Sequence, residues 1–324
     1  MTQILTAVDD MLARELAELR RPLLGFCYRM LGSSHDAEDA VQETMIRAWR
    51  GLSRLDDRSG LRPWVYKIAT NVCIDAANDR RRRALPMDLA APDDGRGNPG
   101  APLAESLWVS PIPSWNVDTD DPVERAMSQE SIRLAFVAAL QHLLPRQRAV
   151  LILRDVLRWR AAEVAALLET SVDAVHSLLR RARATLAEAR RRDVTPPAGN
   201  EPVDPRLLRR YVDAFERFDV DAIVSLLHHD VVVSMPPYSF WLTGRDAFRV
   251  WLEANKATCG HVRPALTDAN GSPAVATYRA GAGGAFEPWA LHVLHWRDGR
   301  IASWHAFIQP ALFAQFGLPQ TVPS

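Results

Sequence analysis

Two adjoining stretches of the chain carry side chains whose chemistry suits recognition of a nucleic acid. In residues 61–75, Trp64, Asn71 and Asp75 place an aromatic ring, an amide and a carboxylate on one predicted helix. Aromatic rings stack on bases, polar groups hydrogen-bond to base edges, and guanidinium groups follow phosphates. The arginines that follow are Arg80, Arg81, Arg82 and Arg83. Together these groups predict binding of single-stranded or distorted DNA.

Each of these groups also has a structural explanation. Trp64 could equally fill a hydrophobic core, and an arginine run is often a solvated helix end. The preceding segment adds weight to the functional interpretation, because residues 36–49 predict a helix with two different faces. Its polar face carries Asp39, Gln42 and Glu43, and its apolar stripe carries Ala37, Val41, Met45 and Ala48. One face builds a core, and the other is free to meet a partner.

Together the two segments resemble region 2 of the sigma-70 family, in its extracytoplasmic-function (ECF) class. The resemblance implies that residues 64–83 melt the promoter and recognise its minus-ten element. It also implies that the 36–49 helix docks on the clamp helices of the largest subunit of bacterial RNA polymerase. The docking residues would be Asp39, Gln42, Glu43 and Trp49.

Residues 161–183 predict a helix-turn-helix. A short amphipathic helix at 161–168 is followed by a tight connection at 169–171 and by a second helix rich in arginine. In this motif the second helix enters the major groove of DNA. The candidate DNA-binding residues are Ser171, Asp173, His176, Ser177, Arg180, Arg181 and Arg183.

This segment resembles region 4 of the same family, which reads the minus-thirty-five element and meets the flap of the second-largest polymerase subunit. Residues 144–148 fit the start of its preceding helix. His176 and Leu178 stand where the family often has basic side chains, and Leu178 is at least as well suited to a core position. The positions that fit the recognition helix are Val175, Ser177, Arg181 and Arg183.

Residues 84–122 predict a linker, because they are rich in proline, glycine and aspartate and have no sustained period. Within them, two tryptophans flank a stretch that is stiffened by proline. A flexible tether has no use for such apolar groups, so we expect this stretch to dock and to serve regulation; a chance cluster is the alternative. Its residues are Trp108, Pro111, Pro113 and Trp115.

Residues 204–320 predict a separate α+β domain. Its amphipathic first helix contains Tyr211 and Phe215, and a second helix is expected at 248–254. Asp298 and Gly299 predict a hairpin between the last two strands. The expected strands lie at 231–233, 274–278, 290–296 and 301–307. Residues 230–237 and 243–245 resemble SnoaL-like domains, which implies a cone with an internal pocket.

The SnoaL-like resemblance raises the question of enzymatic chemistry, because relatives of that domain include polyketide cyclases. His292 and His295 fall on opposite faces of one strand, so a bulge would be needed for both to line one pocket. We interpret the histidines as structural and expect no catalytic set, no metal site and no cofactor. The groups weighed for acid and base roles are His228, His229, Asp230, His292, His295 and His305.

The composition is that of an ordinary soluble protein, with 48% hydrophobic and 24% charged residues and a formal net charge of zero. A neutral chain can still bind DNA where its basic residues cluster, as they do at 80–83 and 180–192. Cys27, Cys73 and Cys259 form no CxxC pair, which argues against a disulfide framework or a zinc site. The sequence has neither a secretory leader nor a membrane-spanning stretch, so we expect a cytoplasmic protein without membrane contact.

We therefore interpret the chain as a multidomain ECF-type sigma factor. Region 2 (5–83) and region 4 (123–192) are all-α, the linker spans 84–122, and the SnoaL-like cone spans 204–320. The expected partners are core RNA polymerase and promoter DNA, and a small ligand in the cone is left open. A ligand-responsive one-component regulator would leave the region 2 segment unexplained. An enzyme would need a convergent nucleophile, base and oxyanion donor, which the sequence does not reveal.

Overall fold

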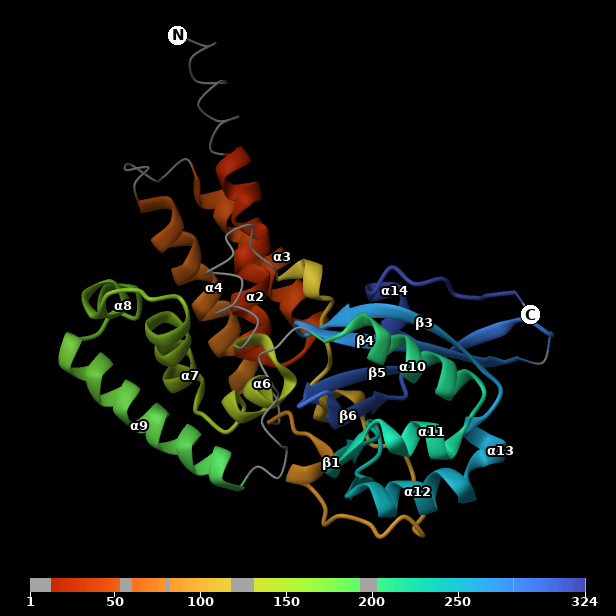
Figure 1. Cartoon of the computed structure of the whole chain (residues 1–324). Coiled ribbons are helices and arrows are strands. Elements are labelled where there is room, and N and C mark those ends of the chain that lie inside the picture. Colours follow the sequence, from red (N-terminus) through yellow and green to blue (C-terminus); the bar gives the residue numbers. More distant parts are fainter. Residues whose placement is uncertain are drawn as a thin grey trace. The chain divides into compact units, whose positions relative to one another are not determined.

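The computed structural model describes residues 13–52, 60–79, 82–117, 131–192, 203–281 and 283–323. The chain forms two compact units (Figure 1). The helical unit combines residues 1–83 with 116–191, and the C-terminal unit combines 84–115 with 192–324. Within the described ranges, no helix is long and apolar enough to cross a membrane.

The helical unit is built from seven labelled α-helices and one π-helical turn (Ile152–Val156) among the described residues. Residues 13–18 add a short helical stretch before them. The helices are α2 (Arg20–Leu31), α3 (Ser34–Gly51), α4 (Leu61–Asn78), α6 (Leu134–Leu140), α7 (Pro145–Leu151), α8 (Ala161–Leu167) and α9 (Val172–Arg192).

Local chemistry sets the junction between α2 and α3. Gly32 ends α2 in the left-handed conformation with φ of 69°, which glycine adopts without steric strain. Ser33 then caps α3, because its backbone is extended and its hydroxyl accepts the Asp36 N–H at 3.2 Å. Ser34 is the first residue of the helix.

Buried arginines join the two halves of the helical unit. Arg148 of α7 donates to the backbone carbonyl of Met30 and, at 2.7 Å, to the side-chain oxygen of Gln141. Arg29 of α2 donates to the Ser131 hydroxyl at 2.8 Å. Burial lowers the pKa of both arginines to about 10, so both stay charged at neutral pH. Hydrogen bonds to charged groups are among the stronger ones in a protein.

The expected helix-turn-helix is confirmed at α8 and α9. Ser171 caps α9, because its hydroxyl accepts the Ala174 N–H at 3.1 Å. The preceding turn is closed by the Thr170 N–H, which donates to the Ala165 carbonyl at 2.9 Å. Val164 and Val175 are buried, so the two helices share a core.

The C-terminal unit contains one six-stranded sheet in the order β2-β1-β6-β5-β4-β3. β1 and β6 are parallel, and the other neighbours are antiparallel. The strands are β1 (Leu227–Ser234), β2 (Trp241–Thr243), β3 (Val262–Ala269), β4 (Ser272–Ala280), β5 (Phe286–Arg297) and β6 (Arg300–Phe307). The helices are α10 (Pro205–Glu216), α11 (Val220–Ser225), α12 (Arg245–Ala254), α13 (Lys256–Cys259) and α14 (Leu312–Gln315).

Two tight turns set the strand register. Asp298 and Gly299 have φ of 51° and 70°, which confirms the hairpin expected between β5 and β6. Asn270 and Gly271, with φ of 54° and 68°, make the same kind of turn between β3 and β4. α10 and α12 pack on one face of the sheet, where Phe215 and Phe248 meet strand residues in a common core. The expected α+β fold of this part is confirmed.

Residues 84–115, here called the strap, pack on the sheet domain of the C-terminal unit. The Asp93 N–H donates to the Trp241 carbonyl at 2.9 Å, and the Leu103 N–H donates to the Pro237 carbonyl at 2.8 Å. Near the end of the strap, the Ile112 N–H donates to the Asn270 side chain at 3.1 Å. The segment that the sequence predicted to be a linker therefore has a defined path on a folded surface.

Candidate functional site

The polar face of α3 is exposed. Asp39 and Gln42 are exposed, and Glu43 is half-buried and accepts a hydrogen bond from Arg47 at 2.7 Å. Trp49 is 61% exposed, although burial of its large apolar ring system would be favourable. Asp39, Gln42, Glu43 and Trp49 follow one another at helical spacing along one side of α3, so the four residues predicted from the sequence form one continuous surface.

An apolar groove of about 470 Å³ adjoins this surface, between residues 13–20 and the end of α3. Ile46 lies between Gln42 and Trp49 on the same side of the helix and is 38% exposed. Large exposed apolar side chains rimmed by polar groups mark protein interaction sites. The groove-lining residues include Leu16, Arg20, Met45, Ile46, Trp49 and Arg50.

The second predicted surface lies on α4. Asn71 and Asp75 are exposed and one helical turn apart. Trp64 is half-buried, and its ring lies against Gly51, where an added Cβ would be 2.8 Å from ring atom Cζ2. The indole therefore packs on the end of α3 and remains partly accessible to solvent.

The arginine run divides into residues with different environments. Arg80 and Arg81 lie outside the described residues. Arg82 is exposed and lies 3.0 Å from Nδ1 of His142. Arg83 is buried and forms an ion pair with Asp36 in the first turn of α3, with only 9% of either side chain exposed. Arg83 could reach a phosphate only by breaking this pair, so the structure argues against the phosphate role predicted for it.

The third predicted surface lies on α9 and the turn before it. Val175 is fully buried, and Ser177 and Leu178 are half-buried. Arg183 makes a bidentate ion pair with Asp155, at 2.9 Å and 2.7 Å, and the hydrogen bonds from this pair raise its pKa. The exposed candidates on this helix and turn are Ser171, Asp173, His176, Arg180, Arg181 and Arg183.

The histidines of the C-terminal unit fall into separate places. His292 lines a small cavity of about 30 Å³ and shares a hydrogen bond of 2.9 Å with the Tyr211 hydroxyl. His295 and His305 bond to serines, Ser303 at 3.0 Å and Ser234 at 2.8 Å. Burial lowers the pKa of His292 to about 3 and that of His305 to about 4, so both are neutral at pH 7. The cavity has room for little more than one water molecule.

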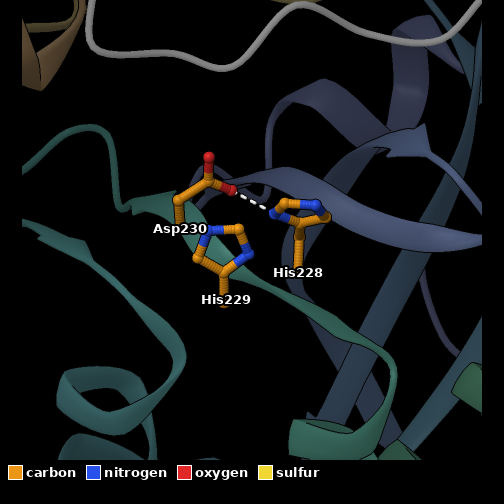
Figure 2. Close-up of side chains that lie close together, drawn as sticks. All are labelled: His228, His229 and Asp230. Atoms are coloured by element: carbon orange, nitrogen blue, oxygen red, sulfur yellow. Dashed lines mark hydrogen bonds and ion pairs between the residues drawn. The ribbon is translucent and has the colours of Figure 1, made fainter.

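Figure 2 shows the other group, in which His228, His229 and Asp230 of β1 converge. The register between β1 and β6 is irregular between Leu227 and Val232, which lets consecutive side chains approach one another. A cation already sits here, because Arg297 donates to the Asp230 carboxylate at 2.8 Å, and its guanidinium lies 2.7 Å from Nδ1 of His228, which is itself paired with that carboxylate.

This arrangement determines the charge state of Asp230. Partial burial raises the pKa of Asp230, but hydrogen bonds from Arg297 and His228 outweigh that effect and lower it overall. A metal ion would compete with the Arg297 guanidinium for the same lone pairs. Asp230, His228 and Arg297 therefore form an ion-pair cluster in which the charge of the carboxylate is already balanced.

Comparisons with known proteins cover most of the chain. Residues 16–83 match Sigma-70 region 2, residues 133–186 match Sigma-70 region 4, and residues 208–304 match the SnoaL-like domain. The ECF RNA polymerase sigma factor SigG of Mycobacterium tuberculosis is 44% identical over 306 residues, which cover 94% of this chain and 82% of SigG. The chain belongs to the ECF RNA polymerase sigma factors. This sigma factor therefore joins regions 2 and 4 to a SnoaL-like domain.

A second relative supports the domain order of the sigma factor. SigJ of M. tuberculosis is 31% identical over 221 residues, which cover 67% of this chain and 62% of SigJ. The crystal structure of SigJ aligns with a TM-score of 0.58 and 25% identity, covering 95% of this sigma factor and 100% of that chain. The fold expected from the sequence, helical regions followed by an α+β domain, is confirmed.

Sequence reasoning missed several residues of these surfaces. Ile46 shares the exposed side of α3, and its position seven residues after Asp39 was the available signal. Lys67 precedes Asn71 by one turn on α4 and was not singled out. The Asp36–Arg83 pair joins residues 47 apart in the sequence, and no local pattern reveals such a partner.

Proposed function

We propose that this sigma factor binds core RNA polymerase through the exposed side of α3, reads the minus-ten element with α4 and reads the minus-thirty-five element with α9. The observation that carries the first part is the exposed Trp49 beside an apolar groove. A water-exposed indole next to acidic and amide groups is the composition of a protein interface, with an aromatic anchor and a polar rim. The clamp helices of the largest polymerase subunit are the proposed partner.

For the minus-ten element, Asn71 and Asp75 are the proposed base-reading residues. Both are exposed on the same side of α4, and an amide and a carboxylate can hydrogen-bond to the edges of unpaired bases. The accessible part of Trp64 offers a stacking surface. Capture of unpaired bases supplies free energy that offsets unstacking, which costs a few kcal/mol for a flipped base.

For the minus-thirty-five element, α9 is the proposed reading helix, with region 4 also meeting the flap of the second-largest polymerase subunit. Arg180 and Arg181 are exposed and suited to phosphates or guanine edges, and His176 precedes them by one turn. The Arg183 side chain is already paired with Asp155, so we assign it to positioning of the helix more than to DNA.

We further propose that the C-terminal unit modulates activity through the strap, because the strap is the covalent connection between regions 2 and 4. The fully buried Trp108 and the docked Ile112 support a role for this segment beyond that of a flexible tether. The C-terminal unit is not assigned a reaction, since His292 is a weak base and the His228 cluster is neutralised by Arg297. Promoter recognition by this family needs no covalent chemistry from the protein.

Run-off transcription with purified core polymerase tests the proposal. The full chain should direct transcription from specific promoters that core polymerase alone does not use. A chain that ends at Arg192, and separately Trp108→Ala, should alter the rate by about five-fold or more if the coupling is of ordinary allosteric size. Equal rates for all three proteins over a range of core concentrations would exclude modulation by the C-terminal unit. Absence of promoter-specific transcripts with the full chain would exclude the function itself.

A further inference from the structure

One contact within the helical unit joins the helix proposed to open the promoter to the helix-turn-helix. Lys67 of α4 donates from Nζ to Oε1 of Glu169 at 2.6 Å. Glu169 lies in the turn between α8 and α9, 102 residues away in the sequence. The two side chains are 38% and 74% exposed, so this is a surface ion pair. Such pairs are weak and easily exchanged for another partner.

The position of Lys67 indicates what that other partner is. Lys67, Asn71 and Asp75 follow one another at intervals of four residues, so they share one side of α4. This is the side proposed to read unpaired bases, and a cation one turn before the reading residues is well placed for the DNA backbone. Lys67 is also one of only two lysines in the sequence, the other being Lys256 in the C-terminal unit.

The backbone at Glu169 adds independent evidence. Its φ of 51° lies in the left-handed region, where glycine or asparagine usually follows a helix. A glutamate in this conformation must be held there by the surrounding structure, and such strained positions are common at functional sites. The neighbouring contact fixes the arrangement further, because the Trp159 ring, which precedes α8, packs on Tyr66 with centroids 5.1 Å apart. Tyr66 immediately precedes Lys67.

The geometry points to Lys67 as a phosphate-binding residue of the minus-ten helix, which the Glu169 carboxylate covers in the unbound sigma factor. This inference rests on the proposed function, in which α4 binds promoter DNA. A carboxylate and a phosphate oxygen compete for the same ammonium group, so region 4 must release Lys67 before DNA can use it. The hydrogen bond from Lys67 lowers the pKa of Glu169, so the carboxylate is ionised and able to compete at neutral pH.

Zero-length cross-linking tests the covered state in the intact protein. A water-soluble carbodiimide joins a carboxylate to an amine only when the two groups touch. Digestion and mass spectrometry of the treated free chain should yield a peptide pair joined through Lys67 and Glu169. The yield should fall several-fold when core polymerase and promoter DNA are added before the reagent. An unchanged yield in the promoter complex would overturn the inference, since Lys67 would then remain covered.

Binding measurements test the role of Lys67 itself. The holoenzyme with Lys67→Gln should bind fork-junction minus-ten DNA more weakly, and the slope of log affinity against log salt should decrease by about one. Glu169→Gln should raise the affinity of the free chain for the single-stranded minus-ten oligonucleotide by about two- to five-fold. In the Lys67→Gln background, Glu169→Gln should have no effect.

Glu188→Gln is the matched control, because it also replaces a glutamate by glutamine, but at a site on α9 where Glu188 pairs with Arg191 of the same helix. It should leave the affinity of the free chain unchanged. If Lys67→Gln leaves both affinity and salt slope unchanged while its holoenzyme still transcribes specifically, the inference fails and the proposed function stands. A wild-type chain that gives no promoter-specific transcript indicates failure of the function instead.

Discussion

Asp36 and Arg83 form an ion pair from which water is almost excluded. Only 9% of each side chain is exposed, so water screens the attraction between the two charges only weakly. The carboxylate also lies in the first turn of α3, where the helix dipole favours a negative charge. Such a pair adds little net stability when intact, but breaking it by removal of one partner is strongly destabilising.

Asp36→Ala should therefore lower the free energy of unfolding by about 3–5 kcal/mol. Asp39→Ala is the matched control, because it makes the same change three residues later on the same helix at an exposed site. It should shift stability by less than about 0.5 kcal/mol. Urea unfolding of the full chain, followed by tryptophan fluorescence and circular dichroism, measures both. Equal midpoints for the two variants would contradict the burial of the pair.

Asp39 and Gln42 should matter for binding instead of stability. We expect Asp39→Ala combined with Gln42→Ala to weaken the affinity for core polymerase by about ten-fold, since interface contacts near an aromatic anchor are sensitive to truncation. Asp246→Ala, an exposed acidic residue in the first turn of α12, serves as the control. Fluorescence anisotropy of a labelled chain titrated with core polymerase would measure the effect. Identical affinities for the wild type and the double variant would remove α3 from the interface.

At the scale of elements, the strap depends on a turn that only glycine fits. Gly95 has φ of 91°, and a Cβ at this position would lie 2.1 Å from the Ala247 carbonyl oxygen of α12. Asp93 holds the turn by accepting the N–H groups of Gly95 at 2.8 Å and Gly97 at 2.9 Å. The strap therefore approaches α12 backbone to backbone, and any side chain at Gly95 forces the two apart.

Gly95→Ala should detach this part of the strap, and Gly100→Ala should not. Gly100 has a similar φ of 77°, but an added Cβ there meets nothing within 4 Å. A comparison of the two variants separates the effect of the clash, which only Gly95→Ala creates, from the effect of the backbone strain, which both substitutions create. Hydrogen exchange of residues 84–115 would detect the difference as faster exchange in Gly95→Ala alone. Equal protection in the two variants would contradict the close approach.

Periodicity in the sequence was sufficient to predict most elements, because the residues of a buried helix or strand face recur at a fixed spacing along the chain. The amphipathic helices, the helix-turn-helix and four of the six strands (β1, β4, β5 and β6) follow from it. β3 was missed although Asn270-Gly271 is a strong hairpin signal, because Pro264 interrupts its run and its apolar residues do not alternate cleanly with polar ones, Leu266 being exposed. Contacts such as Lys67 with Glu169 and Asp36 with Arg83 depend on tertiary packing, which local patterns do not contain.

At the scale of the whole molecule, buried neutral histidines make stability depend on pH. In unfolded chains histidine has a pKa of about 6.5, far above the values of about 3 for His292 and about 4 for His305. Between the folded-state and unfolded-state pKa values, these histidines bind protons in the unfolded chain but not in the folded chain. The free energy of unfolding therefore falls as pH falls below about 6.5, and it keeps falling until the folded-state values are reached.

Each of these histidines should lower the free energy of unfolding by about 1 kcal/mol between pH 7.5 and pH 5.5. His305→Asn removes one titrating group, so the difference between the two pH values should shrink by about that amount, even though the variant loses the bond to Ser234. Urea unfolding at both pH values measures the difference. A wild type whose stability is the same at both values would contradict the neutral burial.

The docked strap also has a consequence for promoter architecture. A free chain of its length, 32 residues, would act as an entropic spring with a mean end-to-end distance of about 30 Å and a broad spread. A segment fixed along a folded surface instead holds its two ends at one defined distance. If the strap stays docked on the sheet domain while the sigma factor is bound to a promoter, transcription should peak sharply at one spacing of the two DNA elements. Insertion of a single base pair between them should then reduce transcription. Gly95→Ala should broaden that optimum, which a series of promoters of graded spacing would reveal.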